Sequence, residues 1–252
     1  MDKKDKLIER DRYNLKAKLF KIKDKALFGC QSMPLYLAEP YLFYESSIKK
    51  LITDGMRVLE LGSGLGEHTK VLLDTSAEIT ALDISINSLK LLKTNFSNYS
   101  NLKICEADME NLPFEDNTFD AVCCSGSLSY GSPDLVDKEI SRVLCDGGIL
   151  ICVDSLNHNL LYRFNRFIHF LRGNRSKATL TQMPTIARIE SMIKSFSYWE
   201  VRYYGAITYL MPLLSKIIGT EQASKLSSRI DKILVVKNSA FKFVLIATNL
   251  QK

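Results

Sequence analysis

Short apolar runs alternate along the chain with segments whose apolar residues recur every three or four positions. Runs of the first kind predict strands, and the spacing of the second kind predicts helices that bury one face. Strands are expected at 58–61, 78–83, 149–154, 198–207 and 241–248, with two more within 102–125. Helices are expected at 69–73, 84–99, 134–144, 160–171 and 184–196. This alternation predicts an α/β fold with a parallel sheet that helices cover on both faces.

The first of these strands runs into a turn that contains three glycines, within the sequence VLELGSGLGEHT at 58–69. Glycine lets the backbone reverse through positive φ angles and lets a ligand lie against bare backbone. The fingerprint of dinucleotide-binding turns would need a glycine at 67, but this position is Glu67, and Glu60 precedes the turn. Two carboxylates would repel a pyrophosphate and attract a ligand that carries an ammonium and a sulfonium.

Four blocks of sequence, in this order and spacing, resemble the class I S-adenosylmethionine-dependent methyltransferases. They are the glycine turn, the strand that ends in Asp83, the stretch at 102–125, and the helix, glycine turn and strand at 139–155. The resemblance implies a Rossmann-like sheet of seven strands, mostly parallel, with an antiparallel last strand. It also implies S-adenosylmethionine as the cofactor, which leaves as S-adenosylhomocysteine.

The same resemblance implies which residues hold the cofactor. Glu60 and the glycines of the turn are expected to shape the methionine pocket, and Asp83 is expected to accept two hydrogen bonds from the ribose. Asp108 is expected to meet the adenine amino group, while Met109 packs on the ring. The complete set of expected cofactor residues is Glu60, Gly62, Ser63, Gly64, Gly66, His68, Asp83, Ile84, Asp108, Met109 and Ser125.

Methyl transfer from a sulfonium is an in-line displacement, which needs alignment of donor and acceptor and no metal. A hydroxyl acceptor must also lose a proton, so a base in the loops after the fourth and fifth strands would help. The candidates are Tyr130, Asp154 and His158. The alternatives are that Tyr130 only lines the pocket and that Asp154 and His158 cap a helix.

The six cysteines form no CxxC pair, so no metal site is expected, and free thiols suit a reducing compartment such as the cytoplasm. No apolar stretch reaches the roughly 18 residues that a membrane span needs, so a soluble protein is expected.

Three parts are expected along the chain: a helical lid at 1–53, an S-adenosylmethionine-binding core at 54–154, and a C-terminal part at 155–252 that completes the sheet. The lid follows from an amphipathic pattern at 3–28 and from the family resemblance, in which such segments close over the cofactor. The alternative is that the aromatic side chains at 34–45 simply pack on the sheet. Two insertions, near 155–183 and 206–239, are expected to form a helical cap.

Charge is distributed unevenly along the chain. The net charge of +6 is the sum of +5 over 1–53, −10 over 54–154 and +11 over 155–252. The basic flanks suggest an anionic partner, either a phosphate-bearing substrate, an anionic membrane surface or RNA, and the alternative is ordinary solvated surface. The basic amphipathic pattern at 160–171 suits peripheral membrane contact, or packing on the cap or on a second subunit.

The acceptor is indicated by a looser resemblance of 155–247 to methyltransferases of bacterial surface-polysaccharide clusters. It implies a small-molecule or glycan acceptor whose methylated group is a sugar hydroxyl. The acceptor molecule is expected to be phosphate-bearing or lipid-linked. The alternatives are a quinone or another small molecule, RNA, and a non-catalytic S-adenosylmethionine-binding subunit. DNA is not expected because the NPPY-type loop is absent, and RNA is disfavoured because no RNA-binding module is recognisable. The oligomeric state stays open.

Overall fold

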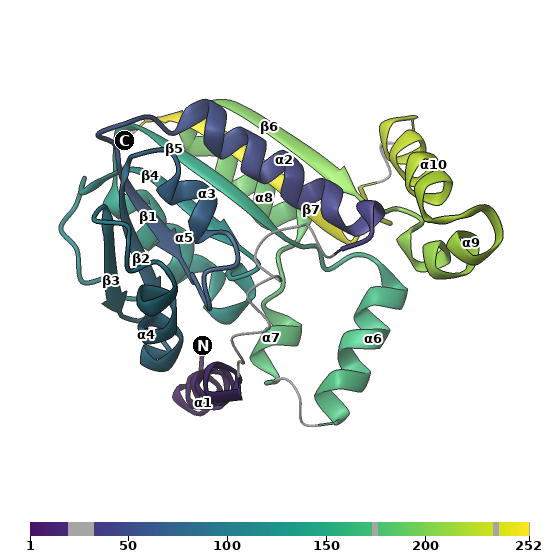
Figure 1. The fold of residues 1–252 in the computed structure, drawn as a ribbon, viewed down its shortest axis with the longest axis horizontal. Coiled ribbons are helices and arrows are strands. Elements are labelled where there is room, and N and C mark those ends of the chain that lie inside the picture. The colour runs from purple at the N-terminus through teal and green to yellow at the C-terminus, as the bar shows by residue number, and fades with distance from the viewer. Residues whose placement is uncertain (20–32, 173–175, 234–236, 252) are drawn as a thin grey trace.

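A computed structural model describes residues 1–19, 33–172, 176–233 and 237–251, and its centre is a seven-stranded sheet (Figure 1). The strands are β1 (Arg57–Leu61), β2 (Glu78–Asp83), β3 (Leu102–Glu106), β4 (Phe119–Ser125), β5 (Leu144–Ser155), β6 (Phe196–Tyr204) and β7 (Lys242–Leu250). They lie in the order β3-β2-β1-β4-β5-β7-β6. Strands β1 to β5 pair in parallel, whereas β7 pairs antiparallel with both β5 and β6. The predicted fold class and antiparallel last strand are confirmed.

Helices cover both faces of this sheet, as predicted. The longer helices are α1 (Lys3–Leu19), α2 (Leu35–Leu51), α4 (Ile86–Asn95), α5 (Pro133–Val143), α6 (Leu160–Leu171), α9 (Met211–Ile218) and α10 (Thr220–Ile233). Shorter ones are α3 (Thr69–Leu73), α7 (Ala178–Thr181), α8 (Ile186–Met192) and the single turns η3 (Leu128–Tyr130), η4 (Ile193–Ser195) and η5 (Thr208–Leu210). Helices α2, α3 and α4 pack on one face, and α5 and α8 pack on the other.

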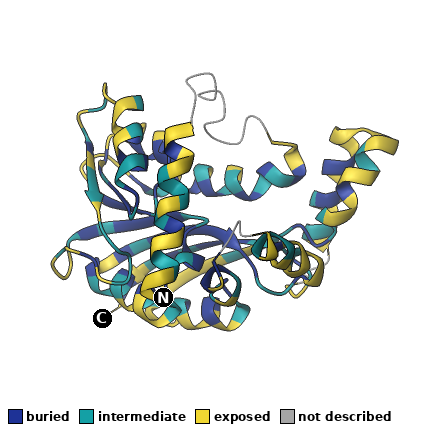
Figure 2. Cartoon of the chain, turned by 90° about the horizontal axis from the view of Figure 1, so that it is seen from below, coloured by how far each residue is buried: buried dark blue, intermediate teal, exposed yellow. Residues whose placement is uncertain are grey.

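Two buried clusters of apolar side chains separate the sheet from its helices, and Figure 2 shows the strands buried between the helical layers. Adjacent residues of β4 divide between these clusters: Cys123 faces the helices α2 to α4, and Cys124 faces α5 and α8. This alternation follows from the two-residue period of a strand. The two thiols therefore act as small apolar side chains on opposite faces.

The strand order reverses between β1 and β4, because the chain builds outward first through β2 and β3 and then through β4 and β5. In open parallel sheets a crevice forms beyond the carboxyl ends of the strands at this point. The glycine turn after β1 and the loop after β4 both lie at that edge. The fold thus gives the expected ligand site its place.

The last part of the chain differs from the sequence prediction in its boundaries. The strand expected at 198–207 is β6, which begins earlier and ends at Tyr204. Gly205 has a φ of +80°, and Asp231 of α10 accepts hydrogen bonds from the backbone N–H groups of Gly205 and Ala206. These bonds turn the chain away from the sheet into the second insertion.

Both insertions are helical. The first contains α6 and α7, which pack against each other, and the second contains α9 and α10, which lie beside β6 and α2 (Figure 1). The amphipathic pattern at 3–28 is helical as far as Leu19, while Phe20, Ile22, Leu27 and Cys30 lie outside the described residues. Within the described part of the chain, no helix is both long enough and apolar enough to span a bilayer.

Candidate cofactor and active site

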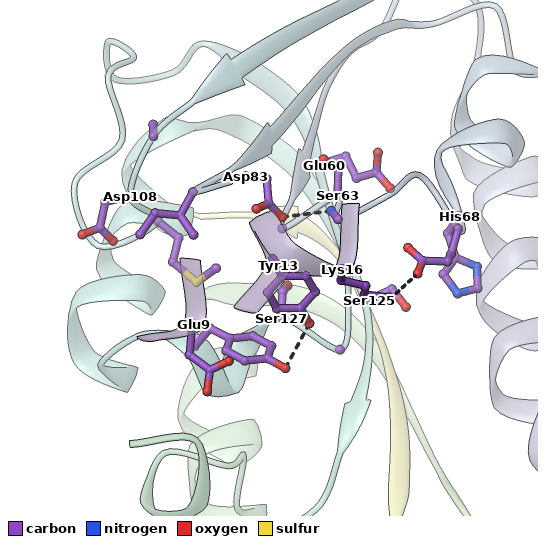
Figure 3. A pocket seen from close by; sticks show the side chains of 18 of the residues that line it. Glu9, Tyr13, Lys16, Glu60, Ser63, His68, Asp83, Asp108, Ser125 and Ser127 are labelled. Atoms are coloured by element: carbon purple, nitrogen blue, oxygen red, sulfur yellow. Dashed lines mark hydrogen bonds and ion pairs between the residues drawn. The ribbon is translucent and has the colours of Figure 1, made fainter. Parts of the chain in front are cut away.

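A cavity of about 270 Å³ lies at the carboxyl edge of the sheet, where the strand order reverses (Figure 3). Its walls come from the ends of β1, β2, β3 and β4, from the glycine turn, from α1 and from α2. The lining residues that were expected from the sequence are Glu60, Gly62, Ser63, Gly64, His68, Asp83, Ile84, Asp108, Met109, Ser125 and Tyr130.

The glycine turn is fastened to the neighbouring strand by backbone hydrogen bonds. The N–H groups of Gly62 and Ser63 both donate to the carbonyl oxygen of Leu82, at 2.8 and 2.9 Å. Gly62 has a φ of +73°, and a Cβ atom there would lie 2.5 Å from the Cβ of Ser127. Only glycine fits both this conformation and this contact. The turn therefore leaves its backbone open to the cavity.

Asp83, the last residue of β2, connects the turn to the next helix. Its Oδ2 accepts a hydrogen bond from the N–H of Gly64 at 2.9 Å, and its Oδ1 accepts one from the N–H of Ser85 at 2.8 Å. Burial raises the pKa of this carboxyl group, and these two hydrogen bonds offset only part of the effect. The carboxylate faces the cavity in Figure 3 with its remaining lone pairs available to a ligand.

Glu60 lies one strand away, at the base of the cavity, and its side chain is almost fully buried. Its Oε2 accepts a hydrogen bond from the hydroxyl of Thr69 at 2.7 Å. Burial raises the pKa of Glu60 to about 8 in spite of that bond. A cationic ligand group beside it would favour the ionised form, so the site is suited to an ammonium or a sulfonium.

The raised pKa of Glu60 predicts a pH dependence of stability. Between the ordinary value of 4.5 and about 8, folded Glu60 keeps a proton that the unfolded chain has released. The free energy of unfolding therefore falls across this range as pH rises. We expect the Glu60→Gln variant to lose less stability than the wild type, by roughly 2–4 kcal/mol, between about pH 5 and about pH 8. Urea unfolding of both proteins at these pH values measures the difference, and equal losses would contradict it.

Gly66, the third glycine of the turn, is not among the residues that line the cavity. Its φ is +93°, and a Cβ atom there would lie 2.8 Å from Cε2 of Phe96. The structure therefore gives Gly66 a role in the close packing of the turn against α4 rather than in direct ligand contact.

His68 follows the turn and is held on the α2 side of the cavity. Its Nδ1 lies 3.0 Å from Oε1 of Glu45, and its ring stacks on Tyr41 with 5.1 Å between the ring centroids. Both Tyr41 and His68 line the cavity. The two side chains therefore form one wall of the expected cofactor site, and their contacts hold the ring of His68 in one orientation.

Helix α1 covers the opposite side of the cavity and contributes residues that the sequence did not single out. They are Lys6, Glu9, Tyr13 and Lys16. Lys6 forms ion pairs with Asp108 and Glu110, which lie after β3. Lys16 pairs with Glu67 beside the glycine turn, with 3.1 Å between Nζ and Oε1. The amphipathic pattern predicted this helix but carried no signal for where it docks.

Tyr130 lies at the meeting point of α1 and the loop after β4. Its hydroxyl oxygen is 3.1 Å from the hydroxyl of Tyr13 and accepts a hydrogen bond from Nη2 of Arg12 at 3.1 Å. The two tyrosine rings meet edge to face, with 5.8 Å between their centroids. Of the three candidate bases, Tyr130 is the one that the structure brings to the cavity.

Asp154 and His158 are not among the residues that line the cavity. Asp154 is buried, and its two oxygens accept hydrogen bonds from the N–H groups of Leu128 and Ser155 at 2.8 and 2.5 Å. Nε2 of His158 accepts a hydrogen bond from the N–H of Ile186, the first residue of α8. Both side chains thus accept hydrogen bonds from backbone donors, while the N-cap of the next helix, α6, is Asn159.

The family model described as a methyltransferase domain matches residues 59–152, which contain the glycine turn, Asp83, Asp108 and the loop after β4. This region is similar to the methyltransferase domains of the class I S-adenosylmethionine-dependent enzymes. The family resemblance seen in the sequence is confirmed for this part of the chain.

Part of the chain is also similar to a curated relative. A demethylmenaquinone methyltransferase of Staphylococcus aureus is 32% identical over 112 residues, which are 41% of this chain and 45% of that protein. The chain therefore matches less than half the length of this relative.

Solved structures share the fold over a larger part of the chain. A chain of the complex between the Haloferax volcanii Trm112 methyltransferase activator and a putative methyltransferase is 16% identical, with a TM-score of 0.62 and coverage of 95% of this chain and 98% of that one. Haemonchus contortus phosphoethanolamine N-methyltransferase 2, solved with phosphomonomethylethanolamine and S-adenosylhomocysteine, is 14% identical with a TM-score of 0.58. The alignment covers 84% of this chain and 53% of that one. At these identities the similarity shows the fold alone.

Proposed function

We propose that this chain binds S-adenosylmethionine in the cavity at the carboxyl edge of the sheet and transfers its methyl group to a small-molecule acceptor. The observation that carries the proposal is the convergence of three carboxyl groups, Glu60, Asp83 and Asp108, on one cavity around an open glycine turn. A cationic ligand with a ribose and a purine offers a matching partner for each of them. The methyltransferase domain supplies the family context.

In this proposal the ligand lies across the ends of β1, β2 and β3. Its ammonium and carboxylate lie near Glu60 and the backbone of Gly62 and Gly64, and its ribose hydroxyls donate to Asp83. The adenine lies between Asp108 and Met109. Helix α1 closes over it through Lys6 and Tyr13 as a lid, whereas α2, the other helix of the segment 1–53, packs on the sheet through Tyr44.

The chain's own contribution to the reaction is alignment, exclusion of water and acceptance of a proton. When bound, the cofactor supplies an electrophilic methyl group and a good leaving group, so positioning provides much of the rate. The phenolic oxygen of Tyr130, held by Arg12 and Tyr13, lies at the cavity, and in its phenolate form it is the group that we propose takes the acceptor's proton and becomes the neutral phenol.

For the acceptor we retain a sugar hydroxyl, phosphate-bearing or lipid-linked, as the proposal. The similarity to a demethylmenaquinone methyltransferase covers 41% of this chain, so we keep a quinone or another small molecule as the alternative. Methylation of RNA and a non-catalytic cofactor-binding subunit stay as the less favoured alternatives.

A transfer assay with methyl-labelled S-adenosylmethionine tests this function. Nucleotide-linked sugars, demethylmenaquinone, ethanolamine phosphate and total RNA would be offered separately, and mass spectrometry would locate the new methyl group. Label on a sugar oxygen supports the proposed acceptor, and label on a quinone carbon or on RNA replaces it. Tight cofactor binding with no transfer to any of these would favour the non-catalytic subunit.

Helix α6 presents an apolar surface that suits the predicted membrane contact of a cytoplasmic protein. Its exposed apolar residues are Leu160, Leu161, Phe164, Phe167 and Leu171. The helix contains no acidic residue and exposes Arg163. We expect sedimentation with vesicles that contain anionic lipid, because apolar burial and charge act together there. Phe164→Ser should weaken this binding about tenfold relative to Leu135→Ser, a matched change on α5. Equal binding of the two variants would exclude the role of α6.

A further inference from the structure

We propose that Arg166, Lys242 and Tyr162 form a subsite for a phosphate group of the acceptor, beside the cofactor cavity. This inference rests on the proposed methyl transfer and names the chemistry of the second substrate. The three side chains lie where α6 and β7 meet the carboxyl end of β5, and we call them the basic cluster. Their side chains take no part in the backbone hydrogen bonds that form the helices and strands.

Arg166 extends from α6 toward the sheet, and only 7% of its surface is exposed. Nη1 donates to the hydroxyl of Tyr162 at 3.2 Å, and Nη2 donates to the carbonyl oxygen of Thr179 at 3.3 Å. Among the described residues, its Nε has no hydrogen-bond partner, and the guanidinium forms no ion pair. A buried guanidinium with an open donor and no counter-charge is costly, because its hydration is lost without replacement.

Lys242 adds a second cation at the first residue of β7. Its Nζ lies 4.8 Å from the centroid of the Tyr41 ring and, within the described parts of the chain, has no carboxylate at ion-pair distance. Burial alone would lower the pKa of Lys242, but Tyr41, Tyr162 and Asp154 outweigh it and raise the pKa. The amine therefore stays charged at neutral pH.

The carboxyl group close to these cations is Asp154, and its oxygens are already used. Each accepts a hydrogen bond from a backbone N–H, one from Leu128 and one from Ser155. Two cations thus face one carboxylate that is held by other donors. An entering anion would supply the missing negative charge and accept from the open donor of Arg166.

The hydroxyl groups of the basic cluster favour a phosphate over a carboxylate. The hydroxyl of Tyr162 lies 2.8 Å from the Oγ of the neighbouring Ser155, and because one of these two groups donates to the other, one hydroxyl donor remains beside the two cations. Burial alone would raise the pKa of Tyr162, but Arg166 and Lys242 outweigh it and lower the pKa, which strengthens the phenol as a donor. Two cations and one free hydroxyl donor match the three non-bridging oxygens of a phosphate ester better than the two oxygens of a carboxylate.

The basic cluster adjoins the proposed reaction site through two residues. Tyr41 lines the cofactor cavity, stacks on His68 and also lies beside Lys242. Asp154 accepts a hydrogen bond from the N–H of Leu128, the first residue of the turn that ends in Tyr130. Tyr162 and Lys242 are intermediate in exposure, in contrast to the buried Arg166. An acceptor phosphate bound here would direct the rest of the molecule toward the cavity.

Titration of the full chain with inorganic phosphate, followed by phosphorus NMR at constant ionic strength, tests the subsite. Lys242→Met should weaken phosphate binding about tenfold or more, because it removes one of two cations. Arg163→Met, on the exposed side of the same helix, should leave it unchanged. Arg166→Met provides a second test of the cluster, and circular dichroism shows whether each variant folds.

Calorimetry with S-adenosylmethionine on the same proteins separates this inference from the proposed function. Loss of phosphate binding in Lys242→Met with unchanged cofactor affinity supports the subsite. Equal phosphate affinity in the wild type and in Lys242→Met overturns it, as does no binding to the wild type. Acetate that binds as tightly as phosphate overturns the choice of phosphate. A wild type that binds phosphate but not the cofactor would contradict the proposed function alone.

Discussion

Replacing Asp83 with alanine is expected to weaken S-adenosylmethionine binding by roughly 1–3 kcal/mol, about 5- to 150-fold. The carboxylate is the proposed acceptor for the ribose hydroxyls, and it also holds the N–H groups of Gly64 and Ser85. Its removal therefore deletes a ligand contact and loosens the turn that shapes the cavity. Calorimetric titration of the wild type and the variant measures the change.

Asp74→Ala is the matched control for this experiment. Asp74 is an aspartate at the end of α3 that pairs with Lys70 on the surface and does not line the cavity. Exposed ion pairs contribute little, so its removal should leave cofactor affinity unchanged within about twofold. An unchanged affinity in Asp83→Ala, with the same result in the control, would remove Asp83 from the site.

Gly62→Ala is expected to give the largest loss of stability among the changes considered. The added Cβ would need a positive φ and would lie 2.5 Å from the Cβ of Ser127, whose hydroxyl donates to the carbonyl oxygen of Leu61. Backbone strain and overpacking together should lower the free energy of unfolding by roughly 2–5 kcal/mol. Cofactor binding should weaken as well, because the backbone that faces the cavity must shift.

Gly55→Ala isolates the conformational part of this effect. Gly55 has a φ of +78°, but a Cβ atom there would meet nothing within 4 Å. This control should lose about 1–2 kcal/mol of stability and keep its cofactor affinity. Urea unfolding of both variants gives the comparison. Equal losses would show that contact with Ser127 does not constrain the turn.

The alternation of apolar runs and helical periods was enough to predict the sheet and its helical layers. Each of these elements buries a local, periodic set of side chains, such as the strand that holds Cys123 and Cys124 on opposite faces. The glycine turn and Asp83 were also predictable, because a turn with positive φ angles leaves a direct trace in the sequence.

The part of the site that comes from distant segments was not predictable in this way. Helix α1 packs on α4 and forms ion pairs through Lys6 with the acidic residues after β3, which are more than a hundred positions away. Nothing in a lysine-rich amphipathic pattern names that partner. The basic cluster was hidden for the same reason, because Arg166 and Lys242 lie on α6 and β7, which are far apart in the sequence.

From residue types alone, we predicted candidate bases at the end of β5 and in the loop after it. Asp154 and His158 have the side chains of an acid and a base, yet both accept hydrogen bonds from backbone N–H groups. Polar side chains near strand ends commonly form such hydrogen bonds with backbone groups. Gly66 shows the reverse case, since its place in the turn is explained by Phe96 rather than by a ligand.

The most direct test of the account is calorimetric titration of the purified chain with S-adenosylmethionine and, separately, with NADH. The carboxyl groups of Glu60, Asp83 and Asp108 predict binding of the cationic cofactor in the micromolar range and no binding of the dinucleotide. Binding of NADH alone, or of neither ligand to the folded protein, would contradict the assignment of this cavity to S-adenosylmethionine.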